Sequence, residues 1–314
     1  MKTKKTKRTY RLRNWKQYNA ALVQRGSLTL WVSDDVVTAW RYPERTGKPG
    51  HPRTYSDTAV FCLATLKEVY HLPLRATIGL TRSIMHLLGL ELPVMSYSQL
   101  SRRCAMLEVT LPRRKKSGAL HMVVDSTGVK VFGEGEWKVR QHGYTKRRTW
   151  RKLHLGADES TGEIVAAMVT TNNVADSQVL ESLLEQVEEE LEQVSGDGSY
   201  DKRNCYEAIR KRNAKAAIPP RRDAKIWQHG NSKEERLIRD ENLRRRRRVG
   251  RKQWKQEVDY HRRSLAETQR FRVKTIFGDR VSARHFAGQA TQVLVRCAAL
   301  NTMTHLGMPD SYAA

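Results

Sequence analysis

Short runs with strand character alternate with helical patterns between residues 119 and 217, and this order constrains the fold more than any other feature. Two of the runs flank an ESTG turn and predict a hairpin. The order strand, strand, strand, helix, strand, helix, strand predicts an α/β fold with a mixed sheet that helices cover. The pieces are LHMVVD (120–125), which ends on Asp125; GVKVF (128–132), after a Ser-Thr-Gly turn; RKLHLGAD (151–158); EIVAAMVTT (163–171); a long helix, DSQVLESLLEQVEEELEQV (176–194); VSGDGSYD (194–201), with Asp197; a helix, DKRNCYEAIRKRN (201–213); and a last strand, KAAIPP (215–220).

The residues before this alternating segment predict helices. Ser56 is a suitable N-cap for one helix, a second ends at Gly89, and Ser96 can cap a third. Two packed helices and a third that carries Arg102 and Arg103 suit a helix-turn-helix DNA reader. Three short helices also occur in many other folds, so both interpretations stay open.

Charge is segregated along the chain, whose formal net charge is +25. Residues 1–118 carry 22 Lys and Arg against 7 Asp and Glu, residues 119–217 carry 14 against 16, and residues 218–314 carry 22 against 10. Basic segments on both sides of a near-neutral middle indicate a polyanionic partner, above all nucleic acid.

The same patterns divide the chain into three parts. We expect a basic N-terminal arm (1–54) with room for one short helix, then a helical DNA-binding region with its linker (55–118). An α/β domain (119–314) follows and contains a small basic insertion at about 221–256.

Several classes of protein are not expected. No apolar run is long enough for a membrane span, and the basic N-terminus has no apolar run behind it to make a signal peptide. The four cysteines are far apart and form no C-x-x-C pair, which argues against a zinc site or a disulfide framework. We therefore expect a protein of the reducing cytoplasm.

Three carboxylates suggest chemistry on the polyanion. Asp125 and Asp197 each end a strand-like run, where ligands commonly bind, although either could simply start a turn. Glu267 is the only acid in YHRRSLAETQRFRVK (260–274). At ~100° per residue, a continuous helix would place Tyr260, Arg263, Glu267 and Lys274 within about 60° on one face, with Phe271 nearby.

Three converging carboxylates would bind hard divalent cations such as Mg²⁺, which prefer oxygen ligands. Two such ions can activate a water or a 3′-hydroxyl and stabilise the leaving oxygen. Neighbouring cations would hold the phosphate backbone, so the arrangement suits phosphoryl transfer on nucleic acid.

These motifs resemble the DDE transposases of bacterial insertion sequences, and most closely the insertion sequence 5 family. Tyr260, Arg263, Glu267 and Lys274 match the family's helix signature without a gap, and VVDSTGVKVFGEGEW (123–137) and GDGSYD (196–201) are similar to its two Asp motifs. The resemblance covers most of the chain.

The resemblance implies a ribonuclease H-like catalytic core with an Asp on its first strand, an Asp after its fourth and a Glu on a later helix. Asp125, Asp197 and Glu267 would then be the catalytic, metal-binding carboxylates, with Mg²⁺ or Mn²⁺ as the cofactor. Arg263 and Lys274 would contact DNA phosphates, and Tyr260 would pack against or hydrogen-bond the same strand. The family also implies binding to terminal inverted repeats and target DNA, 3′-end cleavage, strand transfer and a synaptic homo-oligomer.

Two questions stay open at this level. The run Arg244 to Arg248 is either a solvated basic face or a nonspecific phosphate contact. The alternatives to an active transposase are a DNA-binding regulator that descends from one, and a ribonuclease H-like nuclease that cuts without joining.

Overall fold

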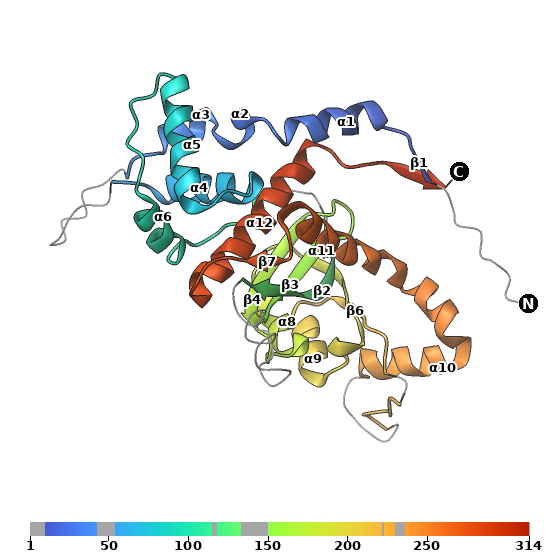
Figure 1. Ribbon diagram of the computed structural model, residues 1–314. Coiled ribbons are helices and arrows are strands. Elements are labelled where there is room, and N and C mark those ends of the chain that lie inside the picture. The colour runs from blue at the N-terminus through green and yellow to red at the C-terminus, as the bar shows by residue number, and fades with distance from the viewer. Residues whose placement is uncertain are drawn as a thin grey trace, which may run out of the picture.

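A mixed sheet lies at the centre of the computed structural model, which describes residues 10–42, 54–114, 118–132, 150–221, 223–229 and 236–313 (Figure 1). Its strand order is β4-β3-β2-β5-β6, and the short strand β7 also pairs with β2. Strands β2, β3 and β4 pair antiparallel, whereas β5, β6 and β7 pair parallel with their neighbours. The structure confirms the expected mixed sheet and the order of its elements, with strands β2 (Leu120–Val131), β3 (Trp150–Asp158), β4 (Ile164–Thr171), β5 (Leu191–Ser195) and β6 (Lys215–Ala217). The sequence pattern did not predict β7 (Arg280–Val281).

Strand β2 is one continuous element, so the turn expected after Asp125 is wrong. Its pairing with β3 runs without interruption through Ser126, Thr127 and Gly128. A Cβ at Gly128 would lie 3.0 Å from the Trp150 ring, so this glycine makes room for a cross-strand aromatic side chain instead of forming a turn. Asp125 therefore lies in the middle of a strand.

Alternate residues of β2 face two separate cores. Val123 and Val129 pack in the core that includes residues of α11 (Ser264–Phe277) and α12 (Phe286–Leu306). Met122 and Val124 pack on the other side with α8 (Asp176–Glu185) and α9 (Arg203–Lys211), and Figure 1 shows these helix pairs on opposite faces of the sheet. Asp125 is two residues from Val123, so its side chain points to the same face of the sheet, the face that α11 covers.

Helix α8 is shorter than the sequence pattern predicts. It ends at Glu185, and Leu191–Ser195 forms β5 instead of a continuation to Val194. Consecutive glutamates at 188–190 disfavour a helix C-terminus, where the backbone dipole favours cations. Arg212 stabilises the turn between α8 and β5 by donating to the carbonyls of Val187 (2.7 Å) and Glu189 (2.8 Å).

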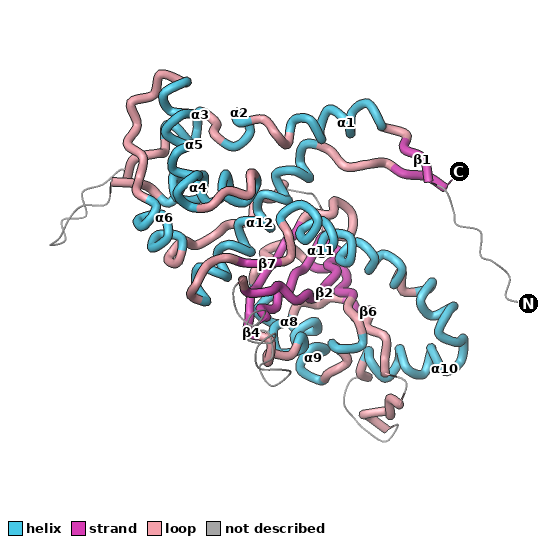
Figure 2. The backbone as a smooth tube through the Cα atoms, in the orientation of Figure 1, coloured by secondary structure: helices cyan, strands magenta, loops and turns pink. Residues whose placement is uncertain are grey.

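The N-terminal third is helical, as Figure 2 shows. The expected helices α4 (Asp57–Val69), α5 (Leu74–Leu87) and α6 (Tyr97–Cys104) are confirmed, and Ser56 and Ser96 cap the first and third of these helices. The segment expected to be an arm with one short helix instead contains α1 (Trp15–Gln24), α2 (Leu28–Trp31) and α3 (Asp34–Thr38). Buried Trp31 and Trp40 pack this segment against the core. Because these tertiary contacts stabilise the short helices, the sequence shows no helical periodicity there.

A buried ion pair connects the N-terminal helices to the C-terminal part of the fold. Arg296 on α12 donates through Nε to Glu68 Oε2 on α4 (2.6 Å), and both side chains are 5% exposed. Arg296 also donates to the carbonyls of Gly278 (3.3 Å) and Arg280 (2.8 Å). Burial raises the pKa of Glu68, but the charges of Arg296 and Lys67 outweigh it and hold that pKa below its usual value.

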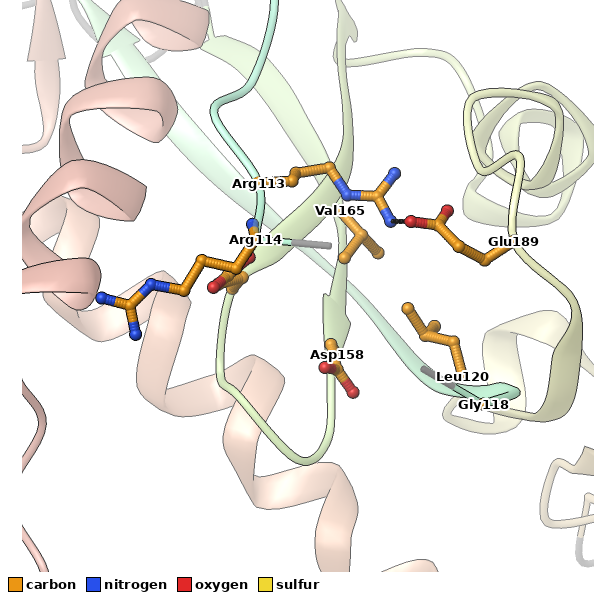
Figure 3. Close-up of a pocket in the computed structure, with 8 residues that line it drawn as sticks. Arg113, Arg114, Gly118, Leu120, Asp158, Val165 and Glu189 are labelled. Carbon is orange, nitrogen blue, oxygen red and sulfur yellow. Dashed lines mark hydrogen bonds and ion pairs between the residues drawn. The ribbon is translucent and has the colours of Figure 1, made fainter. Parts of the chain in front are cut away.

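The linker between the helices and the sheet is anchored at its start. Arg113 forms an ion pair with Glu189, beside Arg114 and Asp158 (Figure 3). The backbone N–H of Arg114 donates to Glu163 Oε2 (3.1 Å). The cavity between these residues has a volume of about 10 Å³, enough for about one water molecule, so this site serves the linker's attachment.

The two ends of the described chain meet in a ribbon, in which β1 (Tyr10–Leu12) pairs antiparallel with β8 (Ser311–Ala313). The four cysteines are free thiols, three of them buried and Cys104 partly buried. None of the described helices is long and apolar enough to cross a bilayer.

We predict that Glu68→Gln destabilises the protein by about 3–5 kcal/mol, because it leaves the buried Arg296 without a counter-charge. Urea unfolding at pH 7 measures this loss. Glu189→Gln is the matched control, since its ion pair with Arg113 is partly exposed and is worth roughly 0–1 kcal/mol. Equal losses in the two variants would contradict the prediction.

The pH dependence follows from the lowered pKa of Glu68. Its ionisation contributes stability that is fully present above the unfolded-state pKa of about 4.3 and is lost as the pH falls through the lower folded-state pKa. The difference between wild type and Glu68→Gln should therefore shrink in acid.

Candidate active site

Among the described residues, the middle of β2 has no neighbouring strand on one edge, and Asp125 lies at this opening. On that edge β5 ends its pairing at Val123, and β7 begins its pairing at Lys130. Within the opening the backbone N–H of Ser126 donates to Asp125 Oδ1 (2.9 Å), and Arg270 Nη1 donates to the Ser126 carbonyl (3.5 Å). Side chains thus satisfy backbone groups that a neighbouring strand would otherwise pair.

The carboxylate of Asp125 keeps one oxygen without a hydrogen bond. Its Oδ2 is buried, accepts no hydrogen bond from the described residues and lies 3.4 Å from Arg270 Nη1. Burial raises the pKa of Asp125, and the charge of Arg270 offsets only part of that effect. A partly desolvated carboxylate with a free oxygen is a favourable position for a cation.

Asp197 follows the next strand, β5, and lies near Asp125. Val123 of β2 pairs with Ser195, the last residue of β5, and Asp197 comes two residues later. The charge of Asp197 contributes to the raised pKa of Asp125, as expected for neighbouring carboxylates. Asp197 Oδ1 also accepts from the Ser199 N–H (2.8 Å) and so caps the short helix η2 (Gly198–Tyr200), which means that Asp197 starts a turn as well.

Glu267 lies on α11, which packs on β2 through buried Ala266 and Val273. Arg263, four residues earlier, forms an ion pair with Glu267, whose side chain is 45% exposed, and the charge of Arg263 also acts on Asp125. Arg270, one turn after Glu267, contacts Asp125. Glu267 and Asp125 therefore share a neighbouring cation, Arg263.

The continuous helix expected through Tyr260 and Glu267 is wrong. Asp259 has a left-handed backbone (φ 49°), Tyr260–Arg263 forms the 3₁₀ helix η3, and α11 begins at Ser264. Tyr260 is 8% exposed and packs against Trp254, with ring centroids 6.1 Å apart. Its phenol therefore belongs to the packing around the site, and burial raises its pKa.

Lys274 is the cation of the signature without an acidic partner. Among the described residues no carboxylate lies within ion-pair distance of its ammonium group. Burial, together with Arg270 and Lys130 nearby, lowers its pKa, and Asp279 opposes this only in part. A group of cations with surplus positive charge suits a phosphate. Phe271 is 67% exposed, so it packs in no core.

The described residues contain no cluster of three His, Cys, Asp or Glu side chains that could hold a metal ion. Arg270 and Arg263 contact Asp125 and Glu267 directly, so cations of the protein itself neutralise these carboxylates. The donors nevertheless fit a hard divalent cation, because all are carboxylate oxygens and Asp125 Oδ2 accepts no hydrogen bond.

The two arginines expected in the DNA-binding helix differ in their surroundings. Arg102 on α6 is exposed. Arg103 donates to the Tyr55 carbonyl (3.0 Å) and pairs with Asp57 (2.6 Å), so it fastens α6 to the start of α4.

The arginine run lies on α10 (Ile238–Glu257). Arg245 forms a bidentate ion pair with Glu257 (2.8 and 2.7 Å). Three others donate to backbone carbonyls of residues 220–228: Arg244, Arg246 and Arg247. Arg248 is exposed. The run therefore also holds the preceding segment, a role that its composition does not reveal.

Sequence reasoning missed Arg270 and Asp176. Arg270 is three residues after Glu267, and this helical spacing is the signal that could have identified it. Asp176 lies on the other side of the sheet, 2.8 Å from Lys152 Nζ and 3.3 Å from His154 Nδ1. Burial opposes its ionisation, but hydrogen bonds from His154, Lys152 and Ser126 dominate and lower the pKa of Asp176.

Two family models, both described as a transposase DDE domain, match residues 116–302 and residues 23–134. The first of these matches alone covers more than half of the chain. The chain therefore belongs to the DDE transposase family. A cryo-EM structure of a piggyBac transposase synaptic complex with hairpin DNA aligns over 91% of this chain and 75% of that chain, with 10% identity and a TM-score of 0.40, and at this TM-score the similarity carries no argument.

We predict that Asp125→Asn raises the stability of the metal-free protein at pH 7. Ionised Asp125 is disfavoured in the folded state because its pKa is raised by burial, and asparagine keeps the acceptor for Ser126. The folded-state pKa exceeds the unfolded one, so the gain disappears as the pH falls below the unfolded-state pKa of about 3.9. Thermal unfolding at pH 3.5 and 7 tests this, with exposed Asp223→Asn as the control, and a loss of stability at pH 7 would refute it.

Proposed function

We propose that this protein is the active transposase of a bacterial insertion sequence of the insertion sequence 5 family. It binds the terminal inverted repeats of its element, cuts their 3′ ends and joins the freed hydroxyls to target DNA. The observation that supports this most strongly is the position of Asp197 two residues after β5, where its charge acts on Asp125 at the unpaired edge of β2. Membership of the DDE transposase family supports the same reaction class.

Asp125, Asp197 and Glu267 are the proposed metal ligands, in a ribonuclease H-like core. DDE transposases generally use divalent metals, and Mg²⁺ (or Mn²⁺), when bound, activates the attacking water or 3′-hydroxyl and stabilises the leaving oxygen. The mid-strand position of Asp125 holds its carboxylate rigidly, because β3 fixes the backbone on one side and α11 packs on the face. Binding of the metal requires Arg270 and Arg263 to release the carboxylates that they neutralise.

The released arginines then have a second use. Arg263, Arg270 and Lys274 lie near the carboxylates and can form ion pairs with the phosphates of the bound strand. The Tyr260 ring helps to position Arg263, because the Arg263 guanidinium lies over that ring, 5.7 Å from its centre. Further DNA contacts are proposed for Arg102 and Arg103 on α6 and for the exposed side of Arg244 to Arg248, and DNA synapsis is proposed to need a homo-oligomer.

Alanine at Asp125, Asp197 or Glu267 should reduce Mg²⁺-dependent cleavage of DNA that carries the element's ends by about 10³-fold or more, since metal activation supplies several kcal/mol to such reactions. Gel assays on end-labelled duplexes measure cleavage, and pre-cleaved ends measure joining separately. Glu181→Ala on the exposed face of α8 is the matched carboxylate control.

The outcomes separate the possible functions. Equal cleavage by wild type and all variants would refute the assignment of these three residues as catalytic metal ligands. Binding to the ends without nicking in Mg²⁺ or Mn²⁺ would indicate a regulator, and cutting without joining would indicate a nuclease.

Lys274→Ala should weaken DNA binding uniformly across sequences. If Lys274 contacts one phosphate, the slope of log K against log salt concentration should fall in magnitude by about 0.9. Fluorescence anisotropy from 50 to 200 mM NaCl gives this slope. Lys211→Ala, whose ammonium group pairs with Glu181 at 2.7 Å, is the control, and an unchanged slope in Lys274→Ala would remove Lys274 from the interface.

A further inference from the structure

Two arginines approach each other where α1, α11 and α12 meet, away from the three carboxylates. Arg25 caps the C-terminus of α1, and Arg272 lies on α11. At ~100° per residue, Arg272 and its neighbour Gln269 lie about 140° and 200° around α11 from Glu267, so they occupy the opposite side of the helix. Arg272 Nη1 donates to Gln269 Oε1 (2.9 Å) and to Thr304 Oγ1 on α12 (3.0 Å).

The donors at this junction lack acceptors. Arg25 Nε and Nη2, Arg272 Nη2 and Gln269 Nε2 are all shielded from solvent and have no hydrogen-bond partner among the described residues. No described carboxylate forms an ion pair with either guanidinium. Buried polar groups are almost always paired, and unpaired buried charges are especially unfavourable, so three unpaired donors on two neighbouring guanidiniums indicate a missing acceptor.

The electrostatics agree with this geometry. Burial and the neighbouring charge of Arg25 lower the pKa of Arg272 to about 10. The Arg25 guanidinium lies 5.8 Å from the centre of the Tyr18 ring, a contact that supplies no formal negative charge. A negative ion between the two guanidiniums would relieve their repulsion and accept their three unpaired donors.

We infer that Arg25, Gln269 and Arg272 form a binding site for one phosphate-type oxyanion. Guanidinium groups match the geometry of phosphate oxygens with paired N–H donors, and buried Gln269 orients Arg272 by accepting from its Nη1. Arg25 is a long side chain at the end of a helix, and its rotation can open the site. The oxyanion is either a backbone phosphate of DNA or free inorganic phosphate, and only the first source rests on the function proposed above.

The test compares the melting temperature of the full chain in sodium phosphate and in sodium chloride at equal ionic strength. A ligand that binds the folded state raises the melting temperature with its concentration. Arg25→Gln should lose the specific rise, and Lys211→Gln, a change at an exposed side chain of α9, should keep it. The same result in wild type and Arg25→Gln would overturn the inference.

A second variant keeps the test decisive, because Arg272 is too buried for simple removal. Gln269→Glu supplies a carboxylate of the same shape to the unpaired donors. It should raise the melting temperature in chloride and abolish the further rise in phosphate. A lower melting temperature in chloride together with an intact phosphate response would contradict a site at this position.

DNA binding then identifies the source of the oxyanion. If the ligand is a backbone phosphate, Arg25→Gln reduces the salt slope of duplex binding by about 0.9, and saturating duplex removes the phosphate response of the wild type. If the ligand is free phosphate, the slope is unchanged and the response persists on DNA. Neither readout involves cleavage, so a failure of the proposed transposition chemistry is distinguishable from a failure of this site.

Discussion

The unpaired edge in the middle of β2 is the constraint on which the candidate site depends. A strand that is paired on one edge only must satisfy its remaining backbone groups in another way. Here Asp125 accepts from the N–H of Ser126, and Arg270 donates to its carbonyl. The same gap that leaves these groups unpaired also allows α11 to bring its charged side chains close to the sheet. Local backbone chemistry and the placement of the carboxylates therefore have a common cause.

That arrangement also explains how a protein with several acids in one place remains stable without a metal. Burial and the nearby charge of Asp197 raise the pKa of Asp125. Arg263, the last residue of η3, and Arg270 on α11 supply counter-charges. A divalent ion would compete with Arg263 and Arg270 for the same carboxylate oxygens. Its affinity would therefore depend on whether these arginines find other anionic partners. Phosphates of a bound strand offer them an alternative partner, which would couple DNA binding to metal binding.

The sequence predicts much of this fold and fails at identifiable places. The order of strands and helices, the helices capped by Ser56 and Ser96, and the hairpin before Ile164 follow from local patterns and are confirmed. The end of α8 and the continuity of β2 were mispredicted because strand pairing, which joins residues far apart in the chain, overrides local propensity. Which side chains neutralise Asp125 depends on the contact between α11 and the sheet, so Arg270 could not be distinguished from other arginines by composition.

The helical signature illustrates the same limit at the level of single residues. Its spacing suggests one continuous helical face, yet the left-handed backbone of Asp259 and the 3₁₀ turn at Tyr260–Arg263 break the helix before Glu267. The break turns Tyr260 inward onto Trp254, while Arg263 remains four residues before Glu267 and so keeps its ion pair. Two residues about one turn apart stay on the same face whether the helix is 3₁₀ or α. Residues two turns apart do not, because the difference in rotation per residue accumulates. A sequence pattern therefore predicts pairs within one turn better than pairs two turns apart, and here Tyr260 packs against Trp254.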